Sequence, residues 1–213
     1  MVLPIGFTSG RALVGGLPAI GDAYEGGFFA GQINDGGTIY NLVVAPKASG
    51  QASSLKFKTS DTVTGGATST TDGPSNTSAL IGAGAAAHPA ANFCNGLSIG
   101  GYTDWYLPAQ DELEVAYYNL KPTTYLNNTS SGTNTNAVPP RNSDYTSGNP
   151  AQTSVTDFQD GNTEFFIVND TWTSTEDSSS PGDVWAQHFI NGNQTSNQVI
   201  KSLPVRAFRR VLA

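Results

Sequence analysis

Two histidines and one cysteine are the side chains of this sequence best suited to hold a metal ion: His88, Cys94 and His188. A zinc site needs three or four ligands in compatible positions, and these three residues lie far apart in the sequence. The sequence also lacks the Asp-x-Asp-x-Asp-Gly pattern of a calcium loop. We therefore expect no metal site and no cofactor.

The motifs of common catalytic sites are absent or stand in the wrong context. The one Gly-x-Ser-x-Gly match, Gly96 to Gly100, follows a predicted helix and not a strand, as the elbow of a nucleophilic serine would. Gly82 and Gly84 do not follow a strand as a phosphate-binding loop would. The paired carboxylates Asp111 and Glu112 come just after Pro108, where a helix is predicted to begin. Negative charge is favourable at the positive end of a helix, which explains this pair better than glycoside hydrolysis does. We therefore expect that the protein is not an enzyme.

The stretch from Gly100 to Leu113 is the centre of the predicted fold. A glycine turn leads into an apolar segment around Trp105, and a helix is expected to follow with Pro108 in its first turn. Apolar residues then recur at helical spacing as far as Leu120. The residues that we expect in the core are Trp105, Leu107, Pro108, Leu113, Tyr117 and Trp172.

A β-hairpin is predicted nearer the N-terminus. Residues 28–33 and 38–45 are rich in strand-forming side chains, and the Asn-Asp-Gly-Gly sequence at 34–37 supplies the turn. The following stretch, 49–78, is polar and rich in Gly, Ser and Thr. Within it we expect one short strand, at 55–58.

An alanine-rich stretch further along predicts a second helix, from Pro89 to Asn95, which Gly96 would end. We expect His88, just before this helix, to be exposed or to cap it. Cys94 is the single cysteine, so it cannot form an intrachain disulfide. We interpret it as a small buried side chain in a protein that folds where thiols stay reduced.

The segment 121–170 is long and shows no regular pattern. Loops of this length are unusual in a compact domain and are often functional. Phe158 and residues 164–168 are expected to pack the segment back onto the core. The strands 184–190 and 205–211 follow it and predict an antiparallel meander.

Charge and hydropathy exclude two classes of partner. Only 13% of the 213 residues are charged, against a typical ~25%, and the net charge is −7. Such a chain has little affinity for a phosphate backbone, so we expect no nucleic-acid binding. We expect the one basic cluster, Arg206, Arg209 and Arg210, to pair with carboxylates. No signal peptide and no apolar run of about 18 residues is present, so we expect no membrane insertion.

Several short motifs, taken in order, resemble a known family. They are Gly101-Tyr-Thr-Asp-Trp-x-Leu-Pro108, a helix with Glu-Leu, Trp172-x-Ser-Thr-Glu176, Trp185-Ala186 and Val205-Arg-Ala-x-Arg-Arg210. The pattern spans roughly residues 28–211 and is similar to the C-type-lectin-like domains of the DUF1566 kind. Together with Tyr-Asn-Leu-Lys-Pro after the helix, it most resembles virion structural proteins of tailed bacteriophages.

This resemblance implies an α+β C-type-lectin-like fold with short antiparallel sheets, two helices, long loops and paired N- and C-terminal strands. We expect it to cover residues 25–213, with residues 1–24 forming an extended arm. The arm is rich in apolar side chains that need a partner surface, and resemblance to phage tropism proteins implies a homo-oligomer, with a trimer favoured. The related formylglycine-generating oxidases use two cysteines, which argues against that activity for a chain with Cys94 alone.

In phage tropism proteins of this family, the surface between the Trp-x-Ser-Thr-Glu block and the last strand binds the ligand. That surface corresponds here to residues 177–197, joined in one interpretation by the long 121–170 loops. Its polar side chains around an aromatic anchor suit adaptable recognition, although Trp185 could equally belong to the core. The candidate ligand-binding residues are Ser179, Asp183, Trp185, Gln187, His188, Asn191, Asn193 and Gln194.

We therefore predict a virion protein, folded in the host cytoplasm, that serves as a tail fibre, baseplate or capsid-surface component. Its partners would be other virion proteins and a host-surface protein or glycan. One alternative is a purely architectural decoration or fibre subunit that binds only virion proteins. An oxidase-like enzyme is a weaker alternative, and fold alone does not decide among the three.

Overall fold

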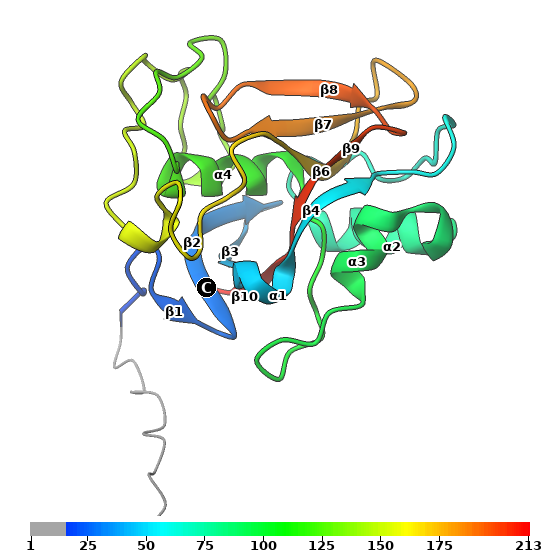
Figure 1. Ribbon diagram of the computed structural model, residues 1–213, viewed down its shortest axis with the longest axis horizontal. Coiled ribbons are helices and arrows are strands. Elements are labelled where there is room, and N and C mark those ends of the chain that lie inside the picture. Colours follow the sequence, from blue (N-terminus) through cyan, green and yellow to red (C-terminus); the bar gives the residue numbers. More distant parts are fainter. Residues whose placement is uncertain (1–15) are drawn as a thin grey trace, which may run out of the picture.

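The computed structural model describes residues 16–213 (Figure 1), and these form an α+β fold with antiparallel strand pairing. Most of the predicted arm, residues 1–15, lies outside the described residues. Its last part, up to residue 24, packs onto the fold, because Ile20 contacts the core and the short strand β1 (Ala23–Tyr24) pairs with β2. In the described part, no helix is long and apolar enough to cross a membrane.

The largest sheet contains the predicted hairpin, and it joins the two ends of the fold. Strands β2 (Gly27–Asp35) and β3 (Thr38–Val44) pair across a Gly36-Gly37 turn. The last strand, β10 (Phe208–Leu212), lies antiparallel to β3, with Phe208 opposite Val44. The expected pairing of the hairpin with the C-terminal strand is thus confirmed. The short β5 (Ala137–Val138) adds to the other side of β2.

The predicted last strand, 205–211, is in fact two strands in two sheets. Strand β9 (Ser202–Arg206) pairs with β4 (Gln51–Lys56), whereas β10 pairs with β3. Ala207 lies between the two strands. Its N–H donates to Gly50 O and its carbonyl accepts from the Ala45 N–H, both at 2.9 Å. The chain therefore changes sheets at Ala207, and period-2 patterning does not reveal this change because it depends on contacts between distant segments.

The third sheet is an antiparallel meander, but of the two strands predicted for a meander, 184–190 and 205–211, only the first lies in it. Strand β7 (Asp183–His188) lies between β6 (Asp170–Glu176) and β8 (Gln194–Gln198), and all pairs are antiparallel. Strand β8 was not expected, because its sequence is polar throughout and shows no apolar alternation. The predicted binding segment is therefore mostly a β-hairpin rather than a free loop.

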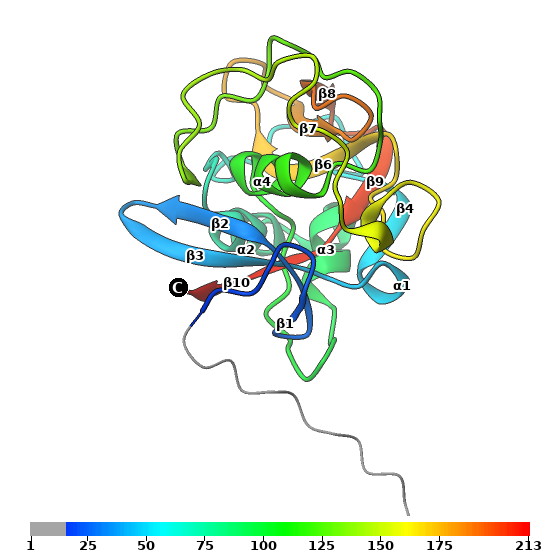
Figure 2. The ribbon, with the colours of Figure 1, turned by 90° about the vertical axis from the view of Figure 1, so that its left-hand side faces the viewer.

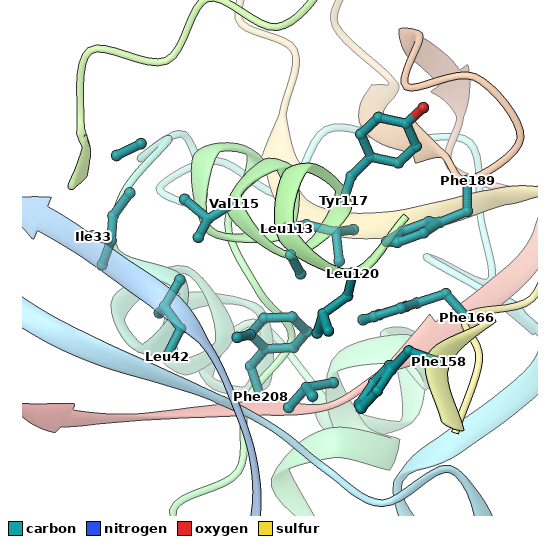
Figure 3. Packing of buried hydrophobic residues seen from close by; sticks show 14 of the residues in the cluster. Ile33, Leu42, Leu113, Val115, Tyr117, Leu120, Phe158, Phe166, Phe189 and Phe208 are labelled. Atoms are coloured by element: carbon teal, nitrogen blue, oxygen red, sulfur yellow. The ribbon is translucent and has the colours of Figure 1, made fainter. Parts of the chain in front are cut away.

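Helix α4 (Gln110–Leu120) lies between the first and third sheets (Figures 1 and 2) and contacts β2, β6 and β7. Its side chains Leu113, Tyr117 and Leu120 are fully buried, as predicted. Figure 3 shows these side chains facing aromatic rings from the loops and from β10. Burial of this face against two sheets fixes the helix in place.

The helix starts just after Pro108, as expected, with Ala109 as the N-cap of α4. Pro108 itself lies just before the helix and not in its first turn. The Glu112 carboxyl accepts the Ala109 N–H at 2.8 Å and so caps the helix from inside.

The predicted core tryptophans are both buried. Trp105 and Trp172 are 2% and 0% exposed and lie in one apolar cluster with Leu107. Each indole N–H donates to a backbone carbonyl, Tyr102 O for Trp105 and Leu55 O for Trp172. Pro108 is buried as well, so the whole predicted core set is confirmed.

The polar stretch 49–78 contains more structure than predicted. Its strand, β4, runs from Gln51 to Lys56, so the expected span 55–58 was too late. Helix α1 (Lys47–Gly50) precedes it, and helix α2 (Gly73–Gly82) was missed altogether. The available signal for α2 was Asp72 followed by Pro74, a cap and an N-terminal proline.

Helix α3 (Pro89–Asn95) matches the prediction, with Gly96 at its C-cap and Cys94 buried. His88 occupies the N-cap position, but its ring is 1% exposed and makes no capping hydrogen bond. The expectation of an exposed or capping side chain is therefore wrong. The ring turns inward because it bonds to Thr64 Oγ1 (2.7 Å) and Gly84 O (2.9 Å).

The long segment 121–170 is mainly loop, as predicted, with only β5 and a short 3-10 turn at 156–158. It arches over α4 (Figure 2). Phe158 and Phe166 are fully buried in the cluster around α4, so the segment packs back onto the core where expected.

Candidate functional site

The eight candidate residues lie along the β7–β8 hairpin in three groups. Trp185, Gln187 and Gln194 form the middle group, and the register places Gln187 opposite Gln194. Ser179 and Asp183 lie at the end of the hairpin that follows β6. His188, Asn191 and Asn193 lie at the turn between β7 and β8. The candidate residues, which the sequence analysis placed on one binding surface, are thus divided among three places in the structure.

The side chains of the turn group, His188, Asn191 and Asn193, form hydrogen bonds that stabilise the turn. Asn191 Oδ1 lies 2.9 Å from His188 Nδ1 and accepts the Asn193 N–H at 3.2 Å. Gly192 has a φ of +77° and closes the turn with a bond from its N–H to His188 O. Asn193 Oδ1 also accepts from Ser131 Oγ at 3.4 Å, which connects the turn to the 121–170 segment.

The group at the other end has a similar local role. Asp177 Oδ1 accepts from both the N–H and the hydroxyl of Ser179, and these bonds lower the pKa of Asp177. Ser180 donates to Asp183 Oδ2 at 2.8 Å. These hydrogen bonds shape the 177–183 turn, as Asx-turns commonly do.

The middle group borders a pocket of about 270 Å³ between the hairpin and the loop at 130–133. Trp185 and Gln194 come from the hairpin, Gln110 from the first turn of α4, and the remaining residues from the 121–170 segment. Segments far apart in sequence therefore meet here. The full lining is Gln110, Ser130, Ser131, Gly132, Thr133, Asp144, Trp185 and Gln194.

Gln187 does not belong to the accessible part of this site. It is 0% exposed, so the expectation that it binds a ligand at the surface is wrong. The reason is its place on the middle strand, between Thr171 of β6 and Gln194 of β8, with α4 packed against β6 and β7. Thr171, Gln187 and Gln194 lie opposite one another on the three strands. Four of their buried side-chain atoms have no hydrogen-bond partner among the described residues: Thr171 Oγ1, Gln187 Nε2, Gln187 Oε1 and Gln194 Nε2.

The loop side of the pocket is anchored to α4 by a buried carboxylate. Glu114 is 1% exposed and accepts from Arg141, from the Tyr145 hydroxyl and from Asn134 Nδ2 (2.6 Å). Burial raises the pKa of Glu114, and Arg141 opposes that shift. The sequence signal for this anchor was a carboxylate three residues before Tyr117, on the apolar side of the helix.

Glu112 is also buried, and the helix dipole does not account for it. Its carboxyl accepts from the Tyr106 hydroxyl at 2.8 Å and from Ala109 N. Burial raises the pKa of Glu112 to about 8, although the two hydrogen bonds and Arg210, 4.0 Å away, oppose the shift. Arg210 also pairs with Asp35 and Asp72. Burial thus opposes the negative charge that the sequence places at this helix start.

The C-terminal arginines pair with carboxylates, as predicted. Arg206 is fully buried against Glu164 at 2.8 Å, and desolvation lowers its pKa to about 10. Arg209 and Arg210 form ion pairs as well, and each lies over a tyrosine ring. The cluster therefore stabilises the fold and offers no open basic surface.

His88 and Cys94 are buried and serve the fold. A backbone carbonyl can only accept, so His88 Nδ1 donates to Gly84 O and Nε2 accepts from the Thr64 hydroxyl. Lys58 donates to the same hydroxyl at 2.9 Å, which ties the 58–64 loop together. Burial raises the pKa of the Cys94 thiol. In residues 16–213, no group of three or more His, Cys, Asp or Glu side chains is arranged to hold a metal ion.

The pocket at Trp185 is therefore the part of the described structure where predicted site residues meet an open cavity. It offers an aromatic side chain, two amides, several hydroxyls and one carboxylate. These groups bind through stacking and hydrogen bonds, the usual chemistry of a recognition site. No protein-family model matches this chain, and no curated protein matches it in sequence.

Proposed function

We propose that this chain is a structural protein of a tailed-phage virion whose C-type-lectin-like domain binds a host-surface ligand at the Trp185 pocket. The motif order in the sequence supports the family. The antiparallel α+β architecture, with its hairpin paired to the C-terminal strand, is compatible with that fold. The virion setting rests on the sequence resemblance.

The observation that carries the binding role is the position of Trp185. It is half-buried at a pocket wall, whereas Trp105 and Trp172 are 2% and 0% exposed. The opposite wall is a loop that the Glu114 anchor holds in place. An aromatic side chain beside rigidly held polar groups is the arrangement of an interface hot spot.

Competition for host cells tests this proposal. The purified protein should bind susceptible cells and reduce adsorption of the phage that carries it, and Trp185→Ala should abolish the effect while lowering the melting temperature only slightly. Tyr125→Ala is the matched control. Tyr125 is an exposed aromatic residue of the 121–170 segment, which also forms one wall of the pocket, but Tyr125 does not line the pocket. Equal competition by both variants would remove the pocket from the binding role.

An architectural role is the second candidate, and exposed apolar side chains favour it. Tyr125 and Leu126 are 66% and 71% exposed, and Leu17 is 59% exposed beside a groove of about 430 Å³. Such side chains suit contacts with virion partners or a second copy of the chain, a trimer being the expected homo-oligomer.

Light scattering and electron microscopy test this second role. Deletion of residues 1–15 should weaken association, and it leaves β1 in place, which deletion of residues 1–24 would not. Imaging of the particle should find the protein at a subunit contact. A full-length protein that is monomeric at all concentrations would argue against a homo-oligomeric architectural role.

A further inference from the structure

We infer that the Trp185 pocket accepts an arginine side chain of a protein partner, whose guanidinium stacks on the Trp185 indole and pairs with Asp144. The inference rests on the proposed binding function and specifies the chemistry of the ligand. Three features of the pocket support it: its charge, its aromatic wall and its volume.

The charge of the pocket favours a cation. Asp144 is the one ionisable side chain in the lining, which contains no Lys, Arg or His. Asp144 accepts a hydrogen bond from Thr133 Oγ1 at 2.8 Å and forms no ion pair with a lysine or arginine of residues 16–213. The whole chain carries a net charge of −7. A cationic group would therefore be attracted both by the whole molecule and by the pocket itself.

The aromatic wall selects a planar cation. Guanidinium groups stack on aromatic rings and bind carboxylates through two N–H groups at once. This molecule uses that combination repeatedly within its own fold. In three places an arginine lies over a tyrosine and pairs with a carboxylate: Arg209 over Tyr102 at 3.7 Å with Asp104, Arg141 over Tyr118 at 4.1 Å with Glu114, and Arg210 over Tyr40 at 4.2 Å with Asp35.

The third feature is the volume of the pocket. The cavity of about 270 Å³ lies just below the ~300–1,000 Å³ range of small-molecule sites, which suits one inserted side chain better than a larger free ligand.

The test compares two peptides of the same shape, one with a cationic guanidinium and one with a neutral urea group that has an oxygen in place of one NH2. The probes are acetyl-Gly-Arg-Gly-amide and the same peptide with citrulline, the neutral isostere of arginine. Indole N–H signals in NMR report binding, and Trp185 is the responsive one because Trp105 and Trp172 are buried and hydrogen-bonded. The arginine peptide should shift the Trp185 signal in a saturable way, and the citrulline peptide should bind about fivefold more weakly or not at all.

A matched pair of variants locates the charge. Asp144→Asn should weaken binding of the arginine peptide about fivefold or more. Asp157→Asn is the control, since Asp157 is also an exposed aspartate of the long segment that accepts from a threonine (Thr163 Oγ1, 3.0 Å), yet it is not part of the pocket. The Asp157→Asn variant makes the same change in net charge as Asp144→Asn and should leave the affinity for the arginine peptide unchanged.

The inference is overturned if arginine and citrulline peptides bind equally, if neither shifts the Trp185 signal, or if the two asparagine variants behave alike. The proposed function fails separately, when Trp185→Ala leaves competition for host cells intact. Loss of cell binding in Trp185→Ala together with no response to the arginine peptide would keep the recognition site but reject arginine as its ligand. A methyl glucoside that shifts Trp185 where the arginine peptide does not would identify a glycan instead.

Discussion

Glu114 in α4 forms an ion pair with Arg141, 27 residues further along the chain. The two side chains are 1% and 16% exposed, and the Tyr145 hydroxyl and Asn134 amide join the same carboxylate. This pair connects the interior of the fold to the loop that forms one wall of the Trp185 pocket. The shape of the pocket therefore depends on a residue that does not line it.

Replacement of Glu114 by glutamine should destabilise the fold. The change leaves the Arg141 charge without its buried partner, and breaking a buried pair from one side costs about 3 kcal/mol. Urea denaturation of Glu114→Gln measures the loss. Glu25→Gln is the control, because Glu25 is 37% exposed and lies 3.6 Å from Arg209, so its loss should cost less than about 1 kcal/mol. Equal effects of the two changes would refute the anchoring role.

Glu112 should make stability fall as pH rises. Its pKa is about 8 in the folded protein against an ordinary 4.5, so between these values the folded state binds one more proton than the unfolded chain. The free energy of unfolding therefore decreases from about pH 4.5 upward until the carboxyl ionises near pH 8.

Glu112→Gln removes this titration and should flatten the pH dependence of stability between pH 5 and 9. Burial also raises the pKa of Asp111 and Glu114, so wild type and variant must be compared at each pH by denaturant titration. Parallel curves for the two proteins would show that Glu112 is ionised in the folded state across this range.

The two later tryptophans should respond differently to truncation. Trp172→Ala should lower the free energy of unfolding by about 3–5 kcal/mol, because Trp172 is 0% exposed and its removal leaves a cavity. Trp105→Ala should cost a similar amount. Trp185→Ala should cost about 1 kcal/mol or less, since the half-buried ring borders an open pocket. A large loss of unfolding free energy in Trp185→Ala would show that Trp185 is a core residue.

Gly192 should resist replacement. It has a φ of +77°, and a Cβ atom there would lie 2.4 Å from Tyr117 Cε1 and 2.6 Å from Tyr145 Cε2. Gly192→Ala should therefore destabilise by about 2–4 kcal/mol through strain and overpacking. Gly148→Ala is the control, because no atom lies within 4 Å of its added Cβ. Thermal melts compare the two, and a neutral effect at Gly192 would mean that the turn can rearrange.

The sequence alone determined the elements that depend on local chemistry and on strong apolar patterns. The hairpin at residues 27–44, the α4 face with Leu113 and Tyr117, and the α3 boundary at Gly96 were predictable, because turn glycines and helical spacing act over a few residues. The burial of Trp105 and Trp172 followed from their neighbours. Helix α2 and strand β8 were missed, because polar residues dominate both.

The tertiary structure alone decided which polar side chains are accessible and which are buried. Gln187 and Gln194 are equally polar in sequence, yet only Gln194 borders the pocket, because Gln187 lies on the middle strand under α4. The pairing of Glu114 with Arg141 and the presence of Asp144 and Trp185 in one pocket lining also depend on contacts between distant segments. Local propensity carries no information about such contacts, since burial and the pairing of charges are set by what the rest of the chain places beside a residue.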